Sequence, residues 1–156
     1  MNLYIKEKNK AYKMYQKIRQ VFCPYLKQKV IFNSKGFRHL IYKSGHIKRD
    51  EKTQLFRIKL LPLAYRLLQV TTTVQEEDFY RSSLEVKEHG KRLKRIKKIY
   101  YYGFIAIIDG WKIKVIVKKI GNGQYFFWSI IPNWMTNRKR DQGKRYLNFT
   151  GDMERD

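Results

Sequence analysis

Apolar and polar positions form a strongly patterned stretch between residues 99 and 131. Its apolar runs are rich in Ile, Val, Tyr and Phe, which strands favour. Two dipeptides interrupt these runs, Asp109-Gly110 and Asn122-Gly123. Both are signals for type I′ turns, because that turn needs a positive φ at both central residues and Asn, Asp and Gly tolerate it. The stretch therefore predicts three β-strands joined by two hairpins.

A two-residue turn at Asp109-Gly110 places Ile108 opposite Trp111 and sorts the first hairpin into two faces. The apolar face, expected to pack on helices, contains Tyr102, Phe104, Ala106, Ile113, Val115 and Val117. The opposite face carries the cations Lys112, Lys114 and Lys118. A two-residue turn at Asn122-Gly123 adds Phe127 and Ser129 to this cationic face. The residues that it points to the core are Phe126, Trp128 and Ile130. A three-residue turn over residues 121–123 would exchange the two faces of the last strand.

Helical spacing of apolar residues predicts an amphipathic helix over residues 2–23, ended by Pro24. Asp50 is a suitable N-cap for another helix over residues 51–68. Pro62 lies inside this second pattern and should kink or break the helix, because proline removes a backbone donor.

Weaker strand signals lie at residues 30–32 and 79–86. After Pro132 the pattern fails. We therefore expect a single α+β nuclease-like domain over residues 1–133. Residues 134–156 are expected to form a basic, partly disordered tail whose last residues are frayed.

The charge balance indicates a class of binding partner. The chain has 35 Lys and Arg against 13 Asp and Glu, a net charge of +22. A field of that sign concentrates polyanions, and nucleic acid is the usual one. Six of the eight residues over 91–98 are basic, Lys94 and Arg95 among them. This run leads directly into the sheet, so we expect it to contact phosphates as well as solvent.

Cysteine usage and hydropathy favour a cytoplasmic protein. Cys23 is the only cysteine, which excludes an intramolecular disulfide and fits a reducing compartment. No apolar run approaches the roughly 20 residues needed to cross a bilayer. We expect no membrane partner.

Motifs for several enzyme classes are missing. The sequence has no GxGxxG, no GxxxxGK[ST] and no HExxH, and its carboxylates are dispersed. These observations argue against a metal-dependent nuclease, and we expect neither metal nor cofactor. RNA cleavage needs less, because the substrate supplies its own nucleophile, the 2′-hydroxyl. The protein has only to move two protons and stabilise the charge on the phosphorane.

His39 is the first candidate for this chemistry. It lies among Arg38, Lys43 and Arg49, and a helix would place His39 and Lys43 on one face. Flanking cations should lower the histidine pKa and favour a neutral base. Ser129, beside Lys114 and Lys118 in the predicted sheet, would hydrogen-bond a phosphate. The less specific alternatives are a surface histidine and a serine that only fills the pleat.

We therefore predict three catalytic residues, which are His39, Lys43 and Ser129. The predicted nucleic-acid-binding residues are Arg38, Arg49, Lys94, Arg95, Lys112, Lys114 and Lys118.

Four short motifs carry a resemblance to a known family. They are RHLIYK at 38–43, KLLPLA at 59–64, KIKVIVKK at 112–119 and FFWSIIP at 126–132. Their order after an N-terminal helix resembles the phage-associated branch of the barnase–EndoU–colicin–RelE ribonucleases, over roughly residues 35–133. By position, His39 and Ser129 fit the active residues of this family best, with Lys43, Arg49 and Lys118 on the phosphate side.

The resemblance implies an α+β fold, in which N-terminal helices pack on one face of a roughly four-stranded antiparallel sheet. It also implies metal-independent cleavage of tRNA or mRNA to a 2′,3′-cyclic phosphate by a toxin-like enzyme. Such an enzyme would have an acidic antitoxin or immunity protein as a second partner. The alternatives are a non-catalytic RNA- or DNA-binding module, and an inhibitor or structural partner of a nucleic-acid machine.

Overall fold

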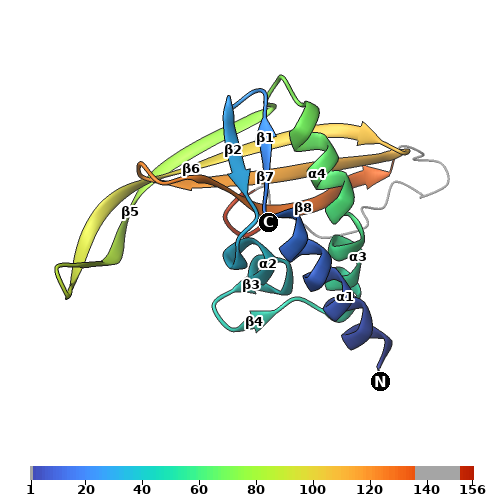
Figure 1. Ribbon diagram of the computed structural model, residues 1–156, viewed down its shortest axis with the longest axis horizontal. Helices are drawn as coiled ribbons and strands as arrows, with labels where there is room; N and C mark the ends of the chain where they lie inside the picture. Colours follow the sequence, from blue (N-terminus) through green and yellow to red (C-terminus); the bar gives the residue numbers. More distant parts are fainter. Residues whose placement is uncertain (1, 136–151) are drawn as a thin grey trace.

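The computed structural model describes residues 2–135 and 152–156, with side chains described as far as Pro132 and again from Asp152 (Figure 1). The helices are α1 (Leu3–Ile18), α2 (Ser34–Ile41), α3 (Glu51–Lys59) and α4 (Leu61–Val70). The strands are β1 (Gln20–Cys23), β2 (Gln28–Ile31), β3 (Tyr42–Ser44), β4 (Ile47–Lys48), β5 (Glu76–Glu88), β6 (Lys91–Ile108), β7 (Trp111–Ile120) and β8 (Tyr125–Met135).

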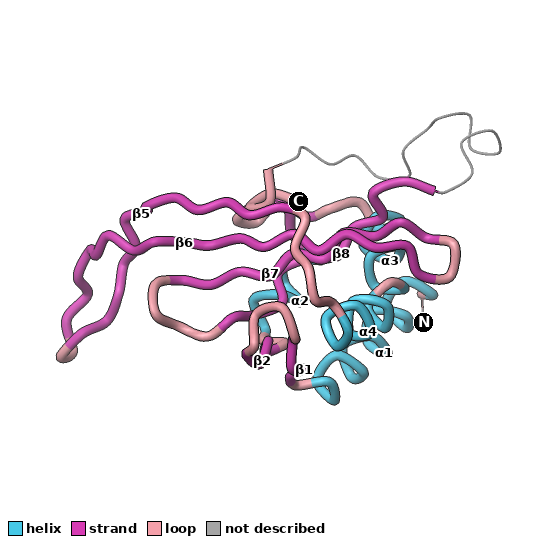
Figure 2. The backbone as a smooth tube through the Cα atoms, turned by 90° about the horizontal axis from the view of Figure 1, so that it is seen from above, coloured by secondary structure: helices cyan, strands magenta, loops and turns pink. Residues whose placement is uncertain are grey.

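The described strands form one large sheet and one small one. The large sheet has six strands in the order β1-β2-β8-β7-β6-β5, and β3 pairs with β4 in a separate two-stranded sheet. The pair β2 and β8 is parallel and the other pairs are antiparallel, so the large sheet is mixed. The hairpin of β5 and β6 extends well beyond the helices (Figure 2).

The expected roughly four-stranded antiparallel sheet with helices on one face is therefore wrong. β1 and β2 add two strands, and β2 enters in parallel. β2 also pairs with β8 only at Tyr125 and Phe126. β7 pairs along one side of β8. On the other side, no strand of the described chain pairs with β8 beyond Phe126, and α2 and α3 contact β8. Residues of these two helices can therefore reach around that edge of the sheet.

Local signals set several element boundaries correctly. Asp50 caps α3, because its carboxylate accepts a hydrogen bond of 2.8 Å from the Thr53 amide. The expected break near Pro62 is confirmed, since α3 ends at Lys59 and α4 begins at Leu61. The first helix is shorter than expected, because Arg19 takes a φ of +58° and the chain turns into β1. No helix of the described chain is both long enough and apolar enough to cross a membrane.

The first predicted hairpin is confirmed and the second is only partly so. Ile108 pairs with Trp111, and Asp109 and Gly110 both have positive φ. The second turn instead runs over residues 121–124, with a positive φ at Gly121. β8 then contains a bulge at Trp128, because its register shifts between the pairs Val117 with Phe127 and Ile116 with Ser129.

The bulge decides which face each β8 residue occupies. Phe127 and Ile130 lie in the main core with the helices. The prediction is therefore confirmed for Ile130, but it is wrong for Phe127, which was expected on the cationic face, and for Phe126 and Trp128, which were expected in this core. Ser129 pairs with Ile116, which lies between Lys114 and Lys118 on the other face. Its predicted face is therefore confirmed, although the turn that was expected to place it there is not present.

A second, smaller core lies on this other face. Ile99, Tyr101 and Ile116 form it together with Met153, which belongs to the last described segment. Met153 is 6% exposed and Asp156 is 2% exposed. The expectation of a frayed end is therefore wrong for these two residues. Residues 136–151 of the predicted tail lie outside the described residues.

Candidate functional site

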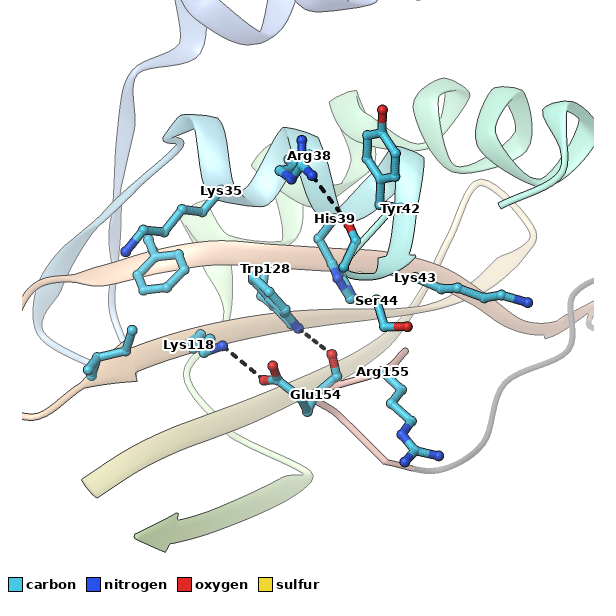
Figure 3. Close-up of a pocket in the computed structure, with 13 residues that line it drawn as sticks. Lys35, Arg38, His39, Tyr42, Lys43, Ser44, Lys118, Trp128, Glu154 and Arg155 are labelled. Carbon is cyan, nitrogen blue, oxygen red and sulfur yellow. Dashed lines mark hydrogen bonds and ion pairs between the residues drawn. The ribbon is translucent and has the colours of Figure 1, made fainter. Parts of the chain in front are cut away.

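A pocket of about 430 Å³ opens where α2, β3, β7, β8 and residues 152–156 meet (Figure 3). Its lining includes the cationic side chains of Lys35, Arg38, Lys43, Lys118 and Arg155. The carboxylate of Glu154 also lines it. Three aromatic side chains, those of Tyr42, Phe126 and Trp128, complete much of its wall. The pocket therefore combines positive charge with flat apolar surfaces, which suits an anionic ligand that carries rings.

The position of α2 is set by a close approach to β8. Asn33 caps α2, its side chain accepting a hydrogen bond of 3.2 Å from the Gly36 amide. A Cβ on Gly36 would lie 2.2 Å from the main-chain oxygen of Phe127, which no real side chain tolerates. Glycine at this position therefore lets the helix lie against the strand. One turn later, His39 meets Trp128.

The imidazole of His39 is buried and neutral. It is 5% exposed and stacks on Trp128 with 4.0 Å between ring centroids. Its Nε2 lies 3.2 Å from Nη2 of Arg49. Because a guanidinium can only donate, Nε2 must accept, and the ring proton is on Nδ1. Burial above all, and then the charges of Arg49, Arg57 and Lys118, lower the pKa of His39 to about 2.

Lys118 and Glu154 form an ion pair at the floor of the pocket. The Lys118 Nζ lies 2.9 Å from Glu154 Oε2 and 4.0 Å from the Trp128 ring centroid. The indole N–H of Trp128 donates to the main-chain oxygen of Glu154 (Figure 3). Burial lowers the pKa of Lys118 to about 8 and raises that of Glu154 to about 7. Both groups therefore change protonation close to neutral pH.

A buried polar centre lies behind this ion pair. Arg57 of α3 is fully buried, and its Nη1 donates to Ser129 Oγ at 2.7 Å and to the main-chain oxygen of Asp156. The Ser129 hydroxyl donates to the same Asp156 oxygen at 2.7 Å. Arg49 Nη2 donates to the main-chain oxygens of Arg155, at 3.0 Å, and Asp156, at 3.4 Å. Three donor side chains thus converge on one oxygen.

The guanidinium of Arg57 has more donors than this arrangement uses. Its Nε and Nη2 have no hydrogen-bond partner among the described residues. Burial lowers the pKa of Arg57 well below its ordinary value. Sequence reasoning missed this residue, although a signal was present. Arg57 lies on the apolar stripe of the predicted helix, one and two turns before Leu61 and Ala64, where an unpaired cation is costly.

The structure brings together several predicted residues in one place. His39, Arg38, Lys43 and Lys118 line the pocket. Ser129 and Arg49 belong to the buried centre behind it. Arg38 is exposed, with its guanidinium carbon 4.3 Å from the Tyr42 ring centroid. The predicted helical pairing of His39 with Lys43 is wrong, because α2 ends at Ile41 and Lys43 lies in β3.

The other predicted residues lie apart from the pocket. Lys114 is buried and its Nζ lies 2.6 Å from Glu76 Oε2, so the expected open cationic face is wrong at this position. Lys112 lies near the start of β7. Lys94 and Arg95 lie on the exposed hairpin of β5 and β6, where Arg95 pairs with Glu88 at 2.9 Å.

Comparisons with family models, with curated proteins and with solved structures found no match to this chain. In the described part of the chain, no three His, Cys, Asp or Glu side chains are grouped so as to hold a metal ion. The side chains of the pocket offer cations for binding, aromatic rings for stacking, and groups that titrate near neutral pH.

Proposed function

We propose that this protein is a ribonuclease that binds tRNA or mRNA in the pocket and cleaves it without a metal ion. The observation that carries the proposal is the convergence of His39, Lys43 and Lys118 on one cationic pocket lined by Trp128. In the reaction, the 2′-hydroxyl oxygen attacks phosphorus and the bond to the 5′-oxygen breaks. The products are a 2′,3′-cyclic phosphate and a 5′-hydroxyl.

Two proton transfers accompany this step, and two pocket residues suit them. The neutral imidazole of His39 has an unprotonated Nε2, which becomes available to the 2′-hydroxyl when Arg49 turns to a phosphate. A phosphate beside the ring would also raise its pKa, because an opposite charge favours the protonated form. Lys118, with a pKa of about 8, would donate a proton to the departing 5′-oxygen. Lys43 and Arg38 would bind the neighbouring phosphates.

The compartment and a protein partner follow from this function. We place it in the cytoplasm, where tRNA and mRNA are found. A protein with a net charge of +22 that cuts cellular RNA would need control, and an acidic antitoxin or immunity protein is the partner that this charge favours. A relationship to the barnase–EndoU–colicin–RelE ribonucleases remains part of the proposal and rests on the short motifs alone.

A second candidate function is a non-catalytic RNA-binding module. One observation favours it, which is that Arg49 caps the Nε2 of His39 while Trp128 covers a ring face. A histidine held in this way would position the pocket without exchanging protons. The cations and aromatic rings would then bind RNA and leave it intact.

One experiment distinguishes the ribonuclease from the non-catalytic RNA-binding module. Purified RNA is incubated with the protein in EDTA, and the products are separated on a gel and tested for 2′,3′-cyclic phosphate ends. His39→Asn should abolish cleavage. His89→Asn, a matched change at the exposed turn between β5 and β6, should leave it unchanged. RNA that is bound by the wild-type protein but stays intact would support the binding module, and cleavage that EDTA abolishes would contradict the mechanism.

A further inference from the structure

We infer that Arg49, Arg57, Ser129 and Lys118 form a binding site for the phosphates of an RNA strand, and that residues 152–156 occupy it in place of the ligand. This inference rests on the proposed function for the identity of the ligand. It adds a residue, Arg57, that the sequence did not suggest. It also assigns the last described segment as a competitor of RNA.

The donor chemistry of the centre indicates a phosphate. Arg57, Ser129 and Arg49 all donate to a single main-chain oxygen, that of Asp156. Two nitrogens of the buried Arg57 have no hydrogen-bond partner among the described residues. A phosphate offers several oxygens in a geometry that a planar guanidinium binds in pairs. The donors of the centre therefore suit the several oxygens of a phosphate.

Residues 152–156 place oxygen atoms against two cations, Arg57 and Lys118. The carboxylate of Glu154 binds Lys118, and the Asp156 oxygen binds Arg57 two residues further on. Consecutive phosphates of a nucleic acid would offer negative oxygens to both positions in the same way. The raised pKa of Glu154, about 7, shows that burial opposes the charged form of this carboxylate. Its bond to Lys118 is correspondingly weakened near neutral pH.

The attachment of this segment is suited to an occupant that can leave. One apolar side chain, Met153, anchors it in the small core with Ile99 and Tyr101. Polar contacts to the Trp128 indole and the Arg49 guanidinium also hold it. Its own backbone closes a single turn, in which the Asp156 amide donates to the Asp152 oxygen at 2.9 Å.

A competitor of this kind lowers the affinity for RNA. The apparent affinity is the intrinsic affinity multiplied by the fraction of molecules in which the site is open. If the segment occupies the site in nine molecules of ten, its removal tightens RNA binding about tenfold. The same removal exposes Lys118, Arg57 and Ser129 to the scissile phosphate. Cleavage at subsaturating RNA should therefore rise by a similar factor.

The test compares three changes in the full chain. The first deletes residues 152–156, and the second is Met153→Ala, which weakens the anchor only. The third is Glu154→Gln, whose matched control is Glu85→Gln, an equal loss of charge on the exposed strand β5. Binding is measured by fluorescence anisotropy with a 2′-O-methylated RNA, which lacks the nucleophile and cannot be cut. Cleavage is measured separately with the unmodified RNA.

We expect at least about tenfold tighter binding for the deletion and a smaller gain for the two substitutions. Glu85→Gln should change the affinity by less than about twofold, since an exposed charge contributes little. Tighter binding without any cleavage would keep the segment as a competitor and overturn the ribonuclease. Cleavage by the wild-type protein with unchanged binding in all three variants would overturn the competitor and keep the ribonuclease. If the deletion fails to fold by circular dichroism, Met153→Ala and Glu154→Gln decide, and an unchanged affinity in both overturns the inference.

Discussion

The imidazole of His39 lies on the indole of Trp128 with only 17° between the two ring planes. This stacking is possible because β8 bulges at Trp128, two residues beyond the part of the strand that pairs with β2. The bulge turns the indole away from the main core and toward α2. Trp128 then connects three parts of the site, since its ring faces His39 and Lys118 and its N–H bonds to Glu154.

The buried His39 should make the folded protein less stable in acid. Its pKa is 6.5 in an unfolded chain and about 2 in the folded protein, so the unfolded chain takes up the proton first as the pH falls. The free energy of unfolding should therefore decrease below pH 6.5, by about 2 kcal/mol between pH 7.5 and pH 5. Urea denaturation at the two pH values measures this loss.

The variant His39→Asn isolates the contribution of the histidine. Glu154 acts in the opposite direction, because its folded pKa of about 7 exceeds its ordinary value of 4.5 and proton uptake then favours the folded state. The difference between wild type and variant removes this shared effect. The wild-type protein should lose about 2 kcal/mol more than His39→Asn on acidification. Equal losses in the two proteins would mean that His39 is protonated in the fold.

The sequence predicted the features of this fold that depend on neighbours along the chain. The turn at Asp109-Gly110, the cap at Asp50 and the break near Pro62 each follow from two or three adjacent residues. The missed features depend on residues far apart. β2 pairs with β8 across almost a hundred positions, and this pairing ends at Phe126, two residues before the bulge at Trp128. No local pattern encodes such a register.

The candidate site shows the same division between features set by neighbouring residues and features set by distant ones. His39 was found because cations surround it in the sequence, and Ser129 because strand alternation put it on the face of Lys118. Arg57 was missed because it lies in a stripe of leucines and alanine. That stripe predicts core packing, and it does not indicate a role for the one charged residue within it. The docking of Met153 was missed because a single methionine in a polar segment carries no periodic signal. Both depend on tertiary contacts that only the folded chain supplies.

Lys118 should set the upper limit of the pH range for cleavage. Burial lowers its pKa to about 8, so its ammonium loses the proton as the pH rises through that value. The rate should therefore fall above pH 8 if Lys118 is the proton donor. Lys118→Arg should be slower at pH 7 and should lack this fall, because a guanidinium stays protonated. Lys119→Arg, the adjacent change, is the control, and a fall that persists in Lys118→Arg would exclude Lys118 as its source.

The hairpin of β5 and β6 offers a second test of RNA contact. Arg81 and Lys98 lie directly opposite each other in its register, and both are exposed. Like charges in this position repel each other unless an anion lies between them. The double variant Arg81→Gln, Lys98→Gln should therefore weaken RNA binding and reduce the slope of log affinity against log salt by about 1 to 2. Lys94→Gln with Arg95→Gln tests the predicted pair in the same titration, and Arg95, already paired with Glu88, should contribute less.

Arg57 should cost the protein stability. A fully buried guanidinium with two unpaired nitrogens loses more hydration than its bonds to Ser129 and Asp156 restore. Buried polar groups without a hydrogen-bond partner cost stability, so an apolar side chain of similar size removes that cost at these two nitrogens. Arg57→Met should therefore keep the free energy of unfolding within about 1 kcal/mol of wild type, or raise it, while RNA binding falls at least tenfold because a charge-assisted contact is lost. Urea denaturation and anisotropy measure the two effects, with Arg66→Met, an exposed partner of Asp109, as the control. A loss of more than about 3 kcal/mol in Arg57→Met would show instead that the arginine holds the fold together.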